Sequence, residues 1–258
     1  MQKLKSSVDK TFALLEYFTP QKPEWGVTEL ATAVGSNKST VYRFLADLCK
    51  LDILCKNPQS DKYQLGLKLF ELGSRVSLKS AFVEKTHPEL QSVAKDITET
   101  VHIAVLKNQQ VFYVDKVESP QGLKISSQIG SYNPAYATAL GKILLAYLPE
   151  SQQRITTQTI LSESKVKSYT KNTITKSRKL QAELAKIKAQ GFAIDREEYE
   201  LGLICVAVPI LNQDGMVIAS LSASGPANRF EEKKVTRYVA TLKKGADAIQ
   251  NKIGFFKP

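Results

Sequence analysis

The sequence predicts an α+β protein of two domains, an N-terminal winged helix-turn-helix and a larger C-terminal domain built on an antiparallel sheet. Three helical segments, with a tight turn between the second and third, precede a short hairpin in the first 65 residues. The rest of the chain holds strand candidates in meander order with helices between them, as in α+β domains. The 258 residues also exceed the roughly 100–200 residues of one domain, so two separate cores are expected.

The first helix is predicted from Val8, Phe12 and Leu15, which recur at helical spacing. Pro20 and Pro23 then end the pattern, because proline has no amide hydrogen to donate and clashes with the preceding turn. One amphipathic helix is therefore expected before these prolines.

The second and third helices are separated by a tight turn. A short second helix is capped by Thr28 and ends before Gly35, which permits the turn. The third helix is opened by Ser36 or Asn37 and covers residues 38–51. The order of helix, helix, tight turn and helix is that of a helix-turn-helix.

A hairpin is predicted directly after the third helix. The apolar residues 53–55 are followed by a polar tip at 57–62, and Tyr63 and Leu65 begin a returning strand. Such a hairpin has the position of a wing. Residues 1–65 are therefore interpreted as one winged helix-turn-helix domain.

A linker helix is expected over residues 66–80, where Leu67, Phe70 and Leu72 follow helical spacing around Gly73. The second domain then covers residues 81–258. Its helices are predicted at 88–100, 138–148, 175–190 and 231–253, and its strands at 101–106, 111–117, 123–129, 192–195, 203–211 and 216–224.

The composition restricts the classes of partner and compartment. A net charge of +11 suits a polyanion, either nucleic acid or an anionic membrane surface, and it is spread over both domains. The N-terminal residues do not resemble a signal peptide, and the apolar run at 201–211 is too short to cross a bilayer. We therefore expect a cytoplasmic protein that does not bind membranes.

No metal or cofactor is expected. The cysteines and histidines form neither a Cys-x-x-Cys pair nor a Cys/His cluster with zinc spacing, and reduced cytosolic thiols are the simpler interpretation. These residues are Cys49, Cys55, Cys205, His87 and His102.

The third helix carries the predicted DNA-reading surface. At about 100° per residue, Val41, Phe44, Leu45 and Leu48 lie on the inward side. The opposite side carries cations and hydroxyls that can bind phosphates and base edges. We assign DNA binding to Lys38, Ser39, Thr40, Tyr42 and Arg43 on this helix and to Lys56 and Lys62 in the wing.

A less specific interpretation stays open for this surface. Asp47, Asp52 and Asp61 dilute its positive charge. The helix-turn-helix could then be a solvated, mildly basic element that serves only packing or dimerisation. Asn57, Gln59 and Ser60 in the wing would suit phosphates or the minor groove in the DNA-binding interpretation.

Several spaced motifs cover nearly the whole chain. They are Val27-Thr-Glu-Leu-Ala, Ser39-Thr-Val-Tyr-Arg-Phe-Leu45, Ala137-Thr-Ala-Leu-Gly-Lys142, Gly202-Leu-Ile-Cys-Val-Ala-Val-Pro209 and Ser222-Ala-Ser-Gly-Pro226. Together they resemble the IclR-type bacterial transcriptional regulators. The resemblance implies a winged helix that binds double-stranded operator DNA, a GAF-like effector-binding domain, and homodimers that can pair into tetramers.

Within this family the chain is most similar to the 2-keto-3-deoxygluconate repressors. The similarity is carried by residues 38–45, 68–73 and 133–142, including Tyr136, and by the aromatic tail at 254–256. It implies a repressor of a sugar-acid catabolic operon, released by 2-keto-3-deoxygluconate or a related keto or sugar acid. An activator or repressor that responds to another small carboxylate or to an aromatic acid is the alternative.

The resemblance also implies a ligand cavity on one face of the sheet. Its residues in this sequence would be Ala139, Leu140, Asp195, Cys205, Ser222 and Ser224, and Asn133 and Tyr136 would add polar contacts to a hydroxylated ligand. Backbone N–H groups at the start of the helix near Thr138 would favour a carboxylate. Two serines spaced two apart on one strand point to the same face.

Other interpretations of these residues remain. Cys205 could equally be a small core residue. The two serines could satisfy buried backbone groups, and His102 could be a structural histidine. Asp195 could cap a turn or pair with Arg196.

Two other classes of protein fit the sequence less well. A hydrolase that uses Cys205 and His102 would need further catalytic motifs, and the sequence contains none, so no enzyme is expected. A constitutive DNA-binding protein without a ligand would differ from a regulator in that no metabolite releases it from its operator.

Overall fold

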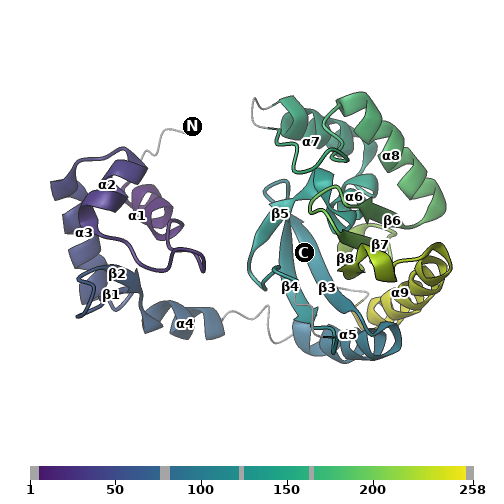
Figure 1. The fold of residues 1–258 in the computed structure, drawn as a ribbon, viewed down its shortest axis with the longest axis horizontal. Coiled ribbons are helices and arrows are strands. Elements are labelled where there is room, and N and C mark those ends of the chain that lie inside the picture. Colours follow the sequence, from purple (N-terminus) through teal and green to yellow (C-terminus); the bar gives the residue numbers. More distant parts are fainter. Residues whose placement is uncertain (1–5, 76–81, 122–124, 163–165, 254–258) are drawn as a thin grey trace. The chain divides into compact units, whose positions relative to one another are not determined.

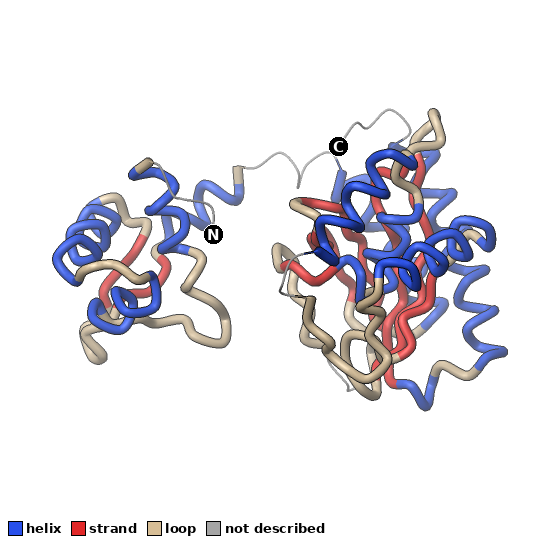
Figure 2. The backbone as a smooth tube through the Cα atoms, turned by 90° about the horizontal axis from the view of Figure 1, so that it is seen from above, coloured by secondary structure: helices blue, strands red, loops and turns tan. Residues whose placement is uncertain are grey.

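The computed structural model describes residues 6–75, 82–121, 125–162 and 166–253. The chain divides into two compact units, Met1–Lys79 and Ser80–Pro258. Each unit has a hydrophobic core of its own. The two units are therefore described separately, and Figures 1 and 2 show the elements of each.

The N-terminal unit is a winged helix-turn-helix with one further helix. In chain order its elements are α1 (Ser7–Leu15), α2 (Val27–Val34), α3 (Lys38–Lys50), β1 (Leu54–Lys56), β2 (Tyr63–Leu65) and α4 (Leu67–Ser74). Strands β1 and β2 pair antiparallel, with Cys55 opposite Gln64. Leu30, Leu45 and Leu54 are among the buried residues of the core beneath these elements.

Local chemistry sets the helix ends in this unit. Asn37 caps α3 by accepting a hydrogen bond from the Thr40 N–H at 3.1 Å. The prediction that Thr28 caps α2 was wrong, because the helix begins at Val27 and Thr28 is already its second residue. Its N-cap is Gly26, whose N–H donates to the Glu29 carboxylate at 3.4 Å. Gly35 follows α2 with φ of 65°, which glycine adopts without strain.

The predicted linker helix at 66–80 corresponds to α4, which ends at Ser74. Residues 76–80 of the predicted helix lie outside the described residues, as does the aromatic tail at 254–256. Helix α4 has no buried residue, and the side chains of Leu67 and Phe70 are 83% and 76% exposed. These are among the most exposed large apolar side chains that the structure describes.

The C-terminal unit is a six-stranded antiparallel sheet between two layers of helices. Its elements are α5 (Glu84–Ile97), β3 (Thr100–Lys107), β4 (Gln110–Val117), β5 (Tyr132–Pro134), η2 (Ala135–Ala137), α6 (Ala139–Ala146), α7 (Glu150–Ser162), α8 (Ser177–Gln190), β6 (Ala193–Arg196), β7 (Leu203–Leu211), β8 (Val217–Pro226), η3 (Ala227–Arg229) and α9 (Glu232–Ile253). The strand order is β5-β4-β3-β8-β7-β6, and every neighbouring pair is antiparallel.

The two helical layers cover opposite faces of this sheet. Helices α5 and α9 pack on one face, and α6 and α8 pack on the other (Figure 1). Leu221 and Leu242 lie in the first core, and Ile143 and Leu184 in the second. The predicted α+β class with an antiparallel sheet is therefore confirmed.

Within this unit one predicted strand was wrong and one helix was not predicted. The strand predicted at 123–129 is absent from its described part, residues 125–129, because the carbonyls of Ile125 and Ser127 accept hydrogen bonds from the Lys116 ammonium instead of pairing with a strand. Strand β5 pairs with β4 in its place. Helix α7 has no counterpart among the predicted elements.

The edge strand β6 has side chains hydrogen-bonded to its backbone. The Ile194 carbonyl accepts a hydrogen bond from the Lys142 ammonium at 2.8 Å, and the Arg196 carbonyl accepts one from the Asn172 amide at 3.1 Å. Among the helices in the described ranges, none is both long enough and apolar enough to cross a membrane.

Candidate functional site

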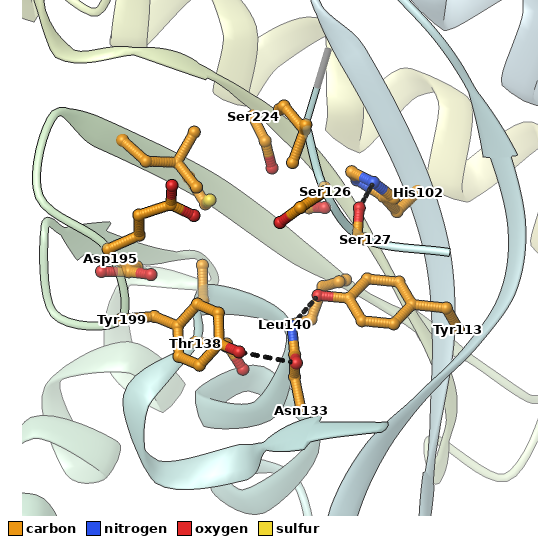
Figure 3. Close-up of a pocket in the computed structure, with 16 residues that line it drawn as sticks. His102, Tyr113, Ser126, Ser127, Asn133, Thr138, Leu140, Asp195, Tyr199 and Ser224 are labelled. Atoms are coloured by element: carbon orange, nitrogen blue, oxygen red, sulfur yellow. Dashed lines mark hydrogen bonds between the residues drawn. The ribbon is translucent and has the colours of Figure 1, made fainter. Parts of the chain in front are cut away.

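A cavity lies on the α6 face of the sheet, between the start of α6 and residues from all six strands, β3 to β8 (Figure 3). Seven of the eight predicted effector residues line it, namely Asn133, Ala139, Leu140, Asp195, Cys205, Ser222 and Ser224. The cavity encloses a free volume of ≈ 30 Å³, so it has room for only one or two water molecules. A larger ligand would have to displace lining side chains.

The strand register brings the polar lining together in two rows. In the first row Asp195 lies opposite Cys205, and Cys205 lies opposite Ser224. In the second row Ser222 of β8 lies opposite His102 of β3. Because residues two apart on a strand share a face, both rows point toward α6. Polar side chains from four strands of the sheet therefore face one cavity.

The first turn of α6 closes one side of the cavity. Thr138 caps this helix by accepting a hydrogen bond from the Gly141 N–H at 3.2 Å. The N–H groups of Ala139 and Leu140, the first two helical residues, have no acceptor within the helix. Both residues line the cavity. This helix start can therefore bind a negatively charged group, which the helix dipole also favours.

Asp195 is a buried carboxyl group at the same cavity. It is 1% exposed and accepts a hydrogen bond from the Glu198 N–H at 2.7 Å. Burial raises the pKa of Asp195 to about 7, an effect that the hydrogen bond and the Lys142 ammonium oppose. Asp195 therefore changes between a hydrogen-bond donor and an anion near neutral pH. No ion pair with Arg196 is present.

Cys205 and His102 do not form a catalytic pair. Desolvation raises the pKa of the Cys205 thiol well above its usual range, and the Asp195 carboxyl group adds to this effect. Desolvation lowers the pKa of His102 to about 3, with a further contribution from the Lys116 ammonium. A neutral thiol and a very weak base do not make an activated nucleophile.

A chain of polar side chains crosses the cavity, and of its members the sequence indicated Asn133 as a ligand contact but not Tyr113, Tyr199 or Ser127. The Tyr199 hydroxyl donates to the Asn133 Oδ1 at 3.0 Å, and the Asn133 Nδ2 donates to the Tyr113 hydroxyl oxygen at 3.1 Å. The Tyr113 ring meets the His102 ring edge-on, with centroids 5.2 Å apart. The His102 Nε2 lies 2.7 Å from the Ser127 hydroxyl. Figure 3 shows this chain running from Tyr199, on the Asp195 side of the cavity, to Tyr113 and His102 on the other side.

Tyr136 is not among the residues that line this cavity, and its contact with a ligand stays a prediction. Its hydroxyl donates to the Lys167 carbonyl at 2.9 Å and accepts from the Lys167 N–H at 3.1 Å. These two bonds hold the ring in the second core, tilted against Tyr169. Tyr136 fixes the segment around Lys167 rather than facing the sheet.

A buried ion pair lies behind the cavity. Lys142 is fully buried, and its ammonium pairs with the Glu198 carboxylate. Because Glu198 N–H also donates to Asp195, the pair is linked to the lining of the cavity through one residue. In the described ranges no group of three or more His, Cys, Asp and Glu side chains could hold a metal ion.

The predicted DNA-reading residues lie on the solvent side of α3. Lys38, Ser39, Tyr42 and Arg43 are exposed, and Thr40 is half-buried. Val41, Leu45 and Leu48 face the core, as helical geometry requires. No hydrogen bond or ion pair within the described chain holds Arg43, so its guanidinium is free to reach an external acceptor.

Several wing residues are already engaged within the protein. Lys56 pairs with Asp61 at 2.5 Å, and Lys62 is exposed. Asn57 and Ser60 both donate to the Glu24 carboxylate, at 2.6 and 2.8 Å, and these bonds lower the pKa of Glu24. The tip of the wing is thus fastened to the segment before α2, and Asn57 and Ser60 serve this contact.

Comparison with known proteins agrees with this architecture. Residues 7–58 match the IclR helix-turn-helix domain, and residues 76–251 match the C-terminal domain of the bacterial transcriptional regulator IclR. The regulator KdgR of Escherichia coli K12 is 38% identical over 97% of this chain and 93% of its own length. The matched relatives are transcriptional regulators, not enzymes.

Solved structures have the same fold. The crystal structure of Thermotoga maritima IclR is 33% identical, covers 96% of this chain and 99% of its own, and superposes with a TM-score of 0.74. An IclR homologue from Microbacterium hydrocarbonoxydans, complexed with 4-hydroxybenzoate, is 22% identical, covers 96% and 99%, and has a TM-score of 0.82. The chain therefore belongs to the IclR family of bacterial transcriptional regulators, near KdgR, and is a ligand-responsive DNA-binding regulator.

Proposed function

We propose that this regulator represses a sugar-acid catabolic operon and that 2-keto-3-deoxygluconate, or a related keto or sugar acid, releases it from its operator. The cavity carries this proposal, because it combines an anion-binding helix start with hydroxyl, amide and imidazole groups. The similarity to KdgR supports the same class of ligand. We place DNA binding in residues 1–65 and effector binding and oligomerisation in residues 81–258, in the cytoplasm.

The carboxylate of the ligand is assigned to the start of α6. The free N–H groups of Ala139 and Leu140 would donate to it, and Ser224 and a protonated Asp195 would donate to the adjacent keto oxygen. Cys205 between them would provide a small apolar contact. A six-carbon acid needs more than the ≈ 30 Å³ that is free, so its binding must displace the walls. This displacement is the proposed link to operator release.

Operator release should depend on pH through Asp195. The carboxyl group holds its proton below pH 7 and loses it above, so an anionic ligand meets like charge only on the alkaline side. We expect the concentration of 2-keto-3-deoxygluconate at half release to be about tenfold higher at pH 8 than at pH 6. Gel-shift titrations on the upstream region of the gene would measure this.

Asp195→Asn is the matched control, because an amide donates at every pH. Its half-release concentration should be the same at pH 6 and pH 8. A wild-type protein that no sugar acid or keto acid releases at either pH would reject the proposed effector class. Release by 4-hydroxybenzoate alone would favour an aromatic acid, the class of ligand held by the homologue of the same fold.

The DNA-binding surface is tested with Arg43→Ala. The Arg43 guanidinium is exposed and free of partners in the described chain, so it can contact a guanine edge. We expect operator binding to weaken by roughly 1–3 kcal/mol, with lower preference for the operator over a scrambled duplex. Arg178→Ala, at an exposed arginine of α8, should leave binding unchanged. Equal weakening on both duplexes would make Arg43 a phosphate contact.

The assembly is proposed to be a homodimer that can pair into a tetramer. Leu67, Phe70 and Leu72 support this, since they place several exposed apolar side chains on the one helix α4, and contiguous exposed apolar patches mark sites of association. Two copies would present two α3 helices to neighbouring half-sites of an operator.

A further inference from the structure

The far side of the cavity contains buried polar atoms without partners. The Ser222 hydroxyl and the His102 Nδ1 have no hydrogen-bond partner in the described part of the chain, although both residues are at least 98% buried. Leaving a buried polar atom without a hydrogen bond costs about 1–3 kcal/mol. Two such atoms on the paired strands β3 and β8, both lining one cavity, therefore indicate a ligand that supplies the missing bonds.

Tyr113 provides a third free hydrogen-bonding position. Its oxygen accepts a hydrogen bond from the Asn133 Nδ2, while Tyr199 binds the other end of the same amide. The hydroxyl hydrogen of Tyr113 then has no acceptor among the residues that the structure describes. Tyr113 is 6% exposed and lines the cavity. The hydroxyl is held in place by an amide that is itself fixed at both ends.

These three groups differ in position and chemistry from the first row of the sheet. Asp195, Cys205 and Ser224 lie in one row, and Ser222 and His102 lie in the next. Figure 3 places Tyr113 and His102 across the cavity from Asp195. His102 is neutral near pH 7, because burial lowers its pKa to about 3. Its free nitrogen can therefore form a hydrogen bond with a neutral group without the burial of a charge.

We propose that His102, Tyr113 and Ser222 form a second subsite that binds hydroxyl groups of the ligand beyond its keto-acid end, and that this subsite selects polyhydroxylated acids over short keto acids. A sugar hydroxyl both donates and accepts, which matches the donating Tyr113 and the amphoteric His102 and Ser222. The inference rests on the proposed function and assigns the specificity within it.

The ammonium group of Lys116 near this subsite already has hydrogen-bond partners. Lys116, opposite His102 in the register, donates to the carbonyls of Ile125 and Ser127 at 3.0 and 2.9 Å. Its ammonium holds this segment beside the ring and is not available to a ligand carboxylate. A carboxylate is therefore bound at the α6 end, and the His102 side is left for neutral oxygens.

The test compares two ligands that share a keto-carboxylate group, 2-keto-3-deoxygluconate and pyruvate, by calorimetric titration of the full chain. The wild-type protein should bind the six-carbon acid at least about tenfold more tightly, the ratio expected for one well-formed hydrogen bond. Tyr113→Phe removes one oxygen atom. It should weaken binding of 2-keto-3-deoxygluconate about tenfold and leave pyruvate binding unchanged.

Tyr238→Phe is the matched control, because Tyr238 is as buried as Tyr113 but lies on α9 in the core of the opposite face. It should change neither affinity. His102→Gln gives a second variant and should also weaken only the six-carbon acid.

The possible failures are distinct. If both ligands lose affinity equally in Tyr113→Phe, or if the variant binds both like the wild type, the subsite is wrong while the proposed effector class stands. Wild-type binding of pyruvate as tight as that of the six-carbon acid also overturns the subsite. A wild-type protein that binds no sugar acid at all overturns both proposals.

Discussion

Lys142→Met is expected to destabilise the C-terminal unit by about 3 kcal/mol. The variant keeps the length of the side chain and removes the ammonium group, so the Glu198 carboxylate, 6% exposed, loses its buried counter-ion. The Ile194 carbonyl also loses a hydrogen-bond donor. Thermal unfolding should shift downward by roughly 6–12 °C for a domain of this size.

The pH dependence of this variant supplies a second measurement. Burial raises the pKa of Glu198, and removal of Lys142 takes away the main influence that lowers it. A folded-state pKa above the unfolded value means that the folded protein binds the proton more tightly, so stability falls as pH rises through this range. The variant should therefore recover part of its stability under mildly acidic conditions.

Two further variants act as controls for Lys142→Met. Lys50→Met removes an ion pair with Asp47 in which both side chains are mostly exposed, and it should leave the unfolding temperature unchanged. Adding Glu198→Gln to Lys142→Met removes the unpaired charge and should restore part of the loss. A shift as small as that of Lys50→Met would contradict the role given to the buried pair.

Gly141→Ala is expected to cost about 3 kcal/mol and to abolish tight effector binding. A Cβ at this position would lie 2.3 Å from both the Cα and the carbonyl oxygen of Ala135. Both are backbone atoms, so α6 would have to move away from η2. Because Ala139 and Leu140 at the start of α6 line the cavity, the movement would displace the proposed carboxylate site. Thermal unfolding and calorimetric titration with 2-keto-3-deoxygluconate measure the two effects.

Gly73→Ala is the matched control for this substitution. Gly73 also lies within a helix, α4, but in the described part of the chain nothing outside the helix's own backbone lies within 4 Å of the added Cβ. Because alanine has the higher helix propensity, the variant should be stabilised by up to about 1 kcal/mol. Equal behaviour of the two alanine variants would show that contact with Ala135 does not constrain α6.

Much of the fold could be predicted because its elements have regular apolar patterns. The strand predicted at 203–211 has the bounds of β7, and the helix predicted at 38–51 is α3 with one residue fewer. Helix α7 could not be predicted in this way. Its sequence is rich in threonine and glutamine, and Ile155 is exposed. The helix depends on tertiary contacts, such as the Gln153 amide that donates to the carbonyls of Leu145 and Ala146 at 3.0 and 3.1 Å.

The cavity was only partly predictable for a similar reason. Ser222 and Ser224 share a face by their spacing alone, and the family resemblance supplied Asp195 and Cys205. His102 and Tyr113 meet through the register of β3 and β4, which shifts between Ile103 and Ala104. A shift of this kind cannot be read from the sequence, because it depends on how the two strands pair.

The hydrogen bonds to the edge of the sheet have a consequence for self-association. An exposed edge strand is a template on which another chain can extend the sheet. In β6 the Ile194 and Arg196 carbonyls already accept hydrogen bonds from Lys142 and Asn172. An incoming strand would have to compete with these donors. The same lysine that neutralises Glu198 thus also discourages edge-to-edge aggregation, so its loss would expose the protein to misassembly as well as to unfolding.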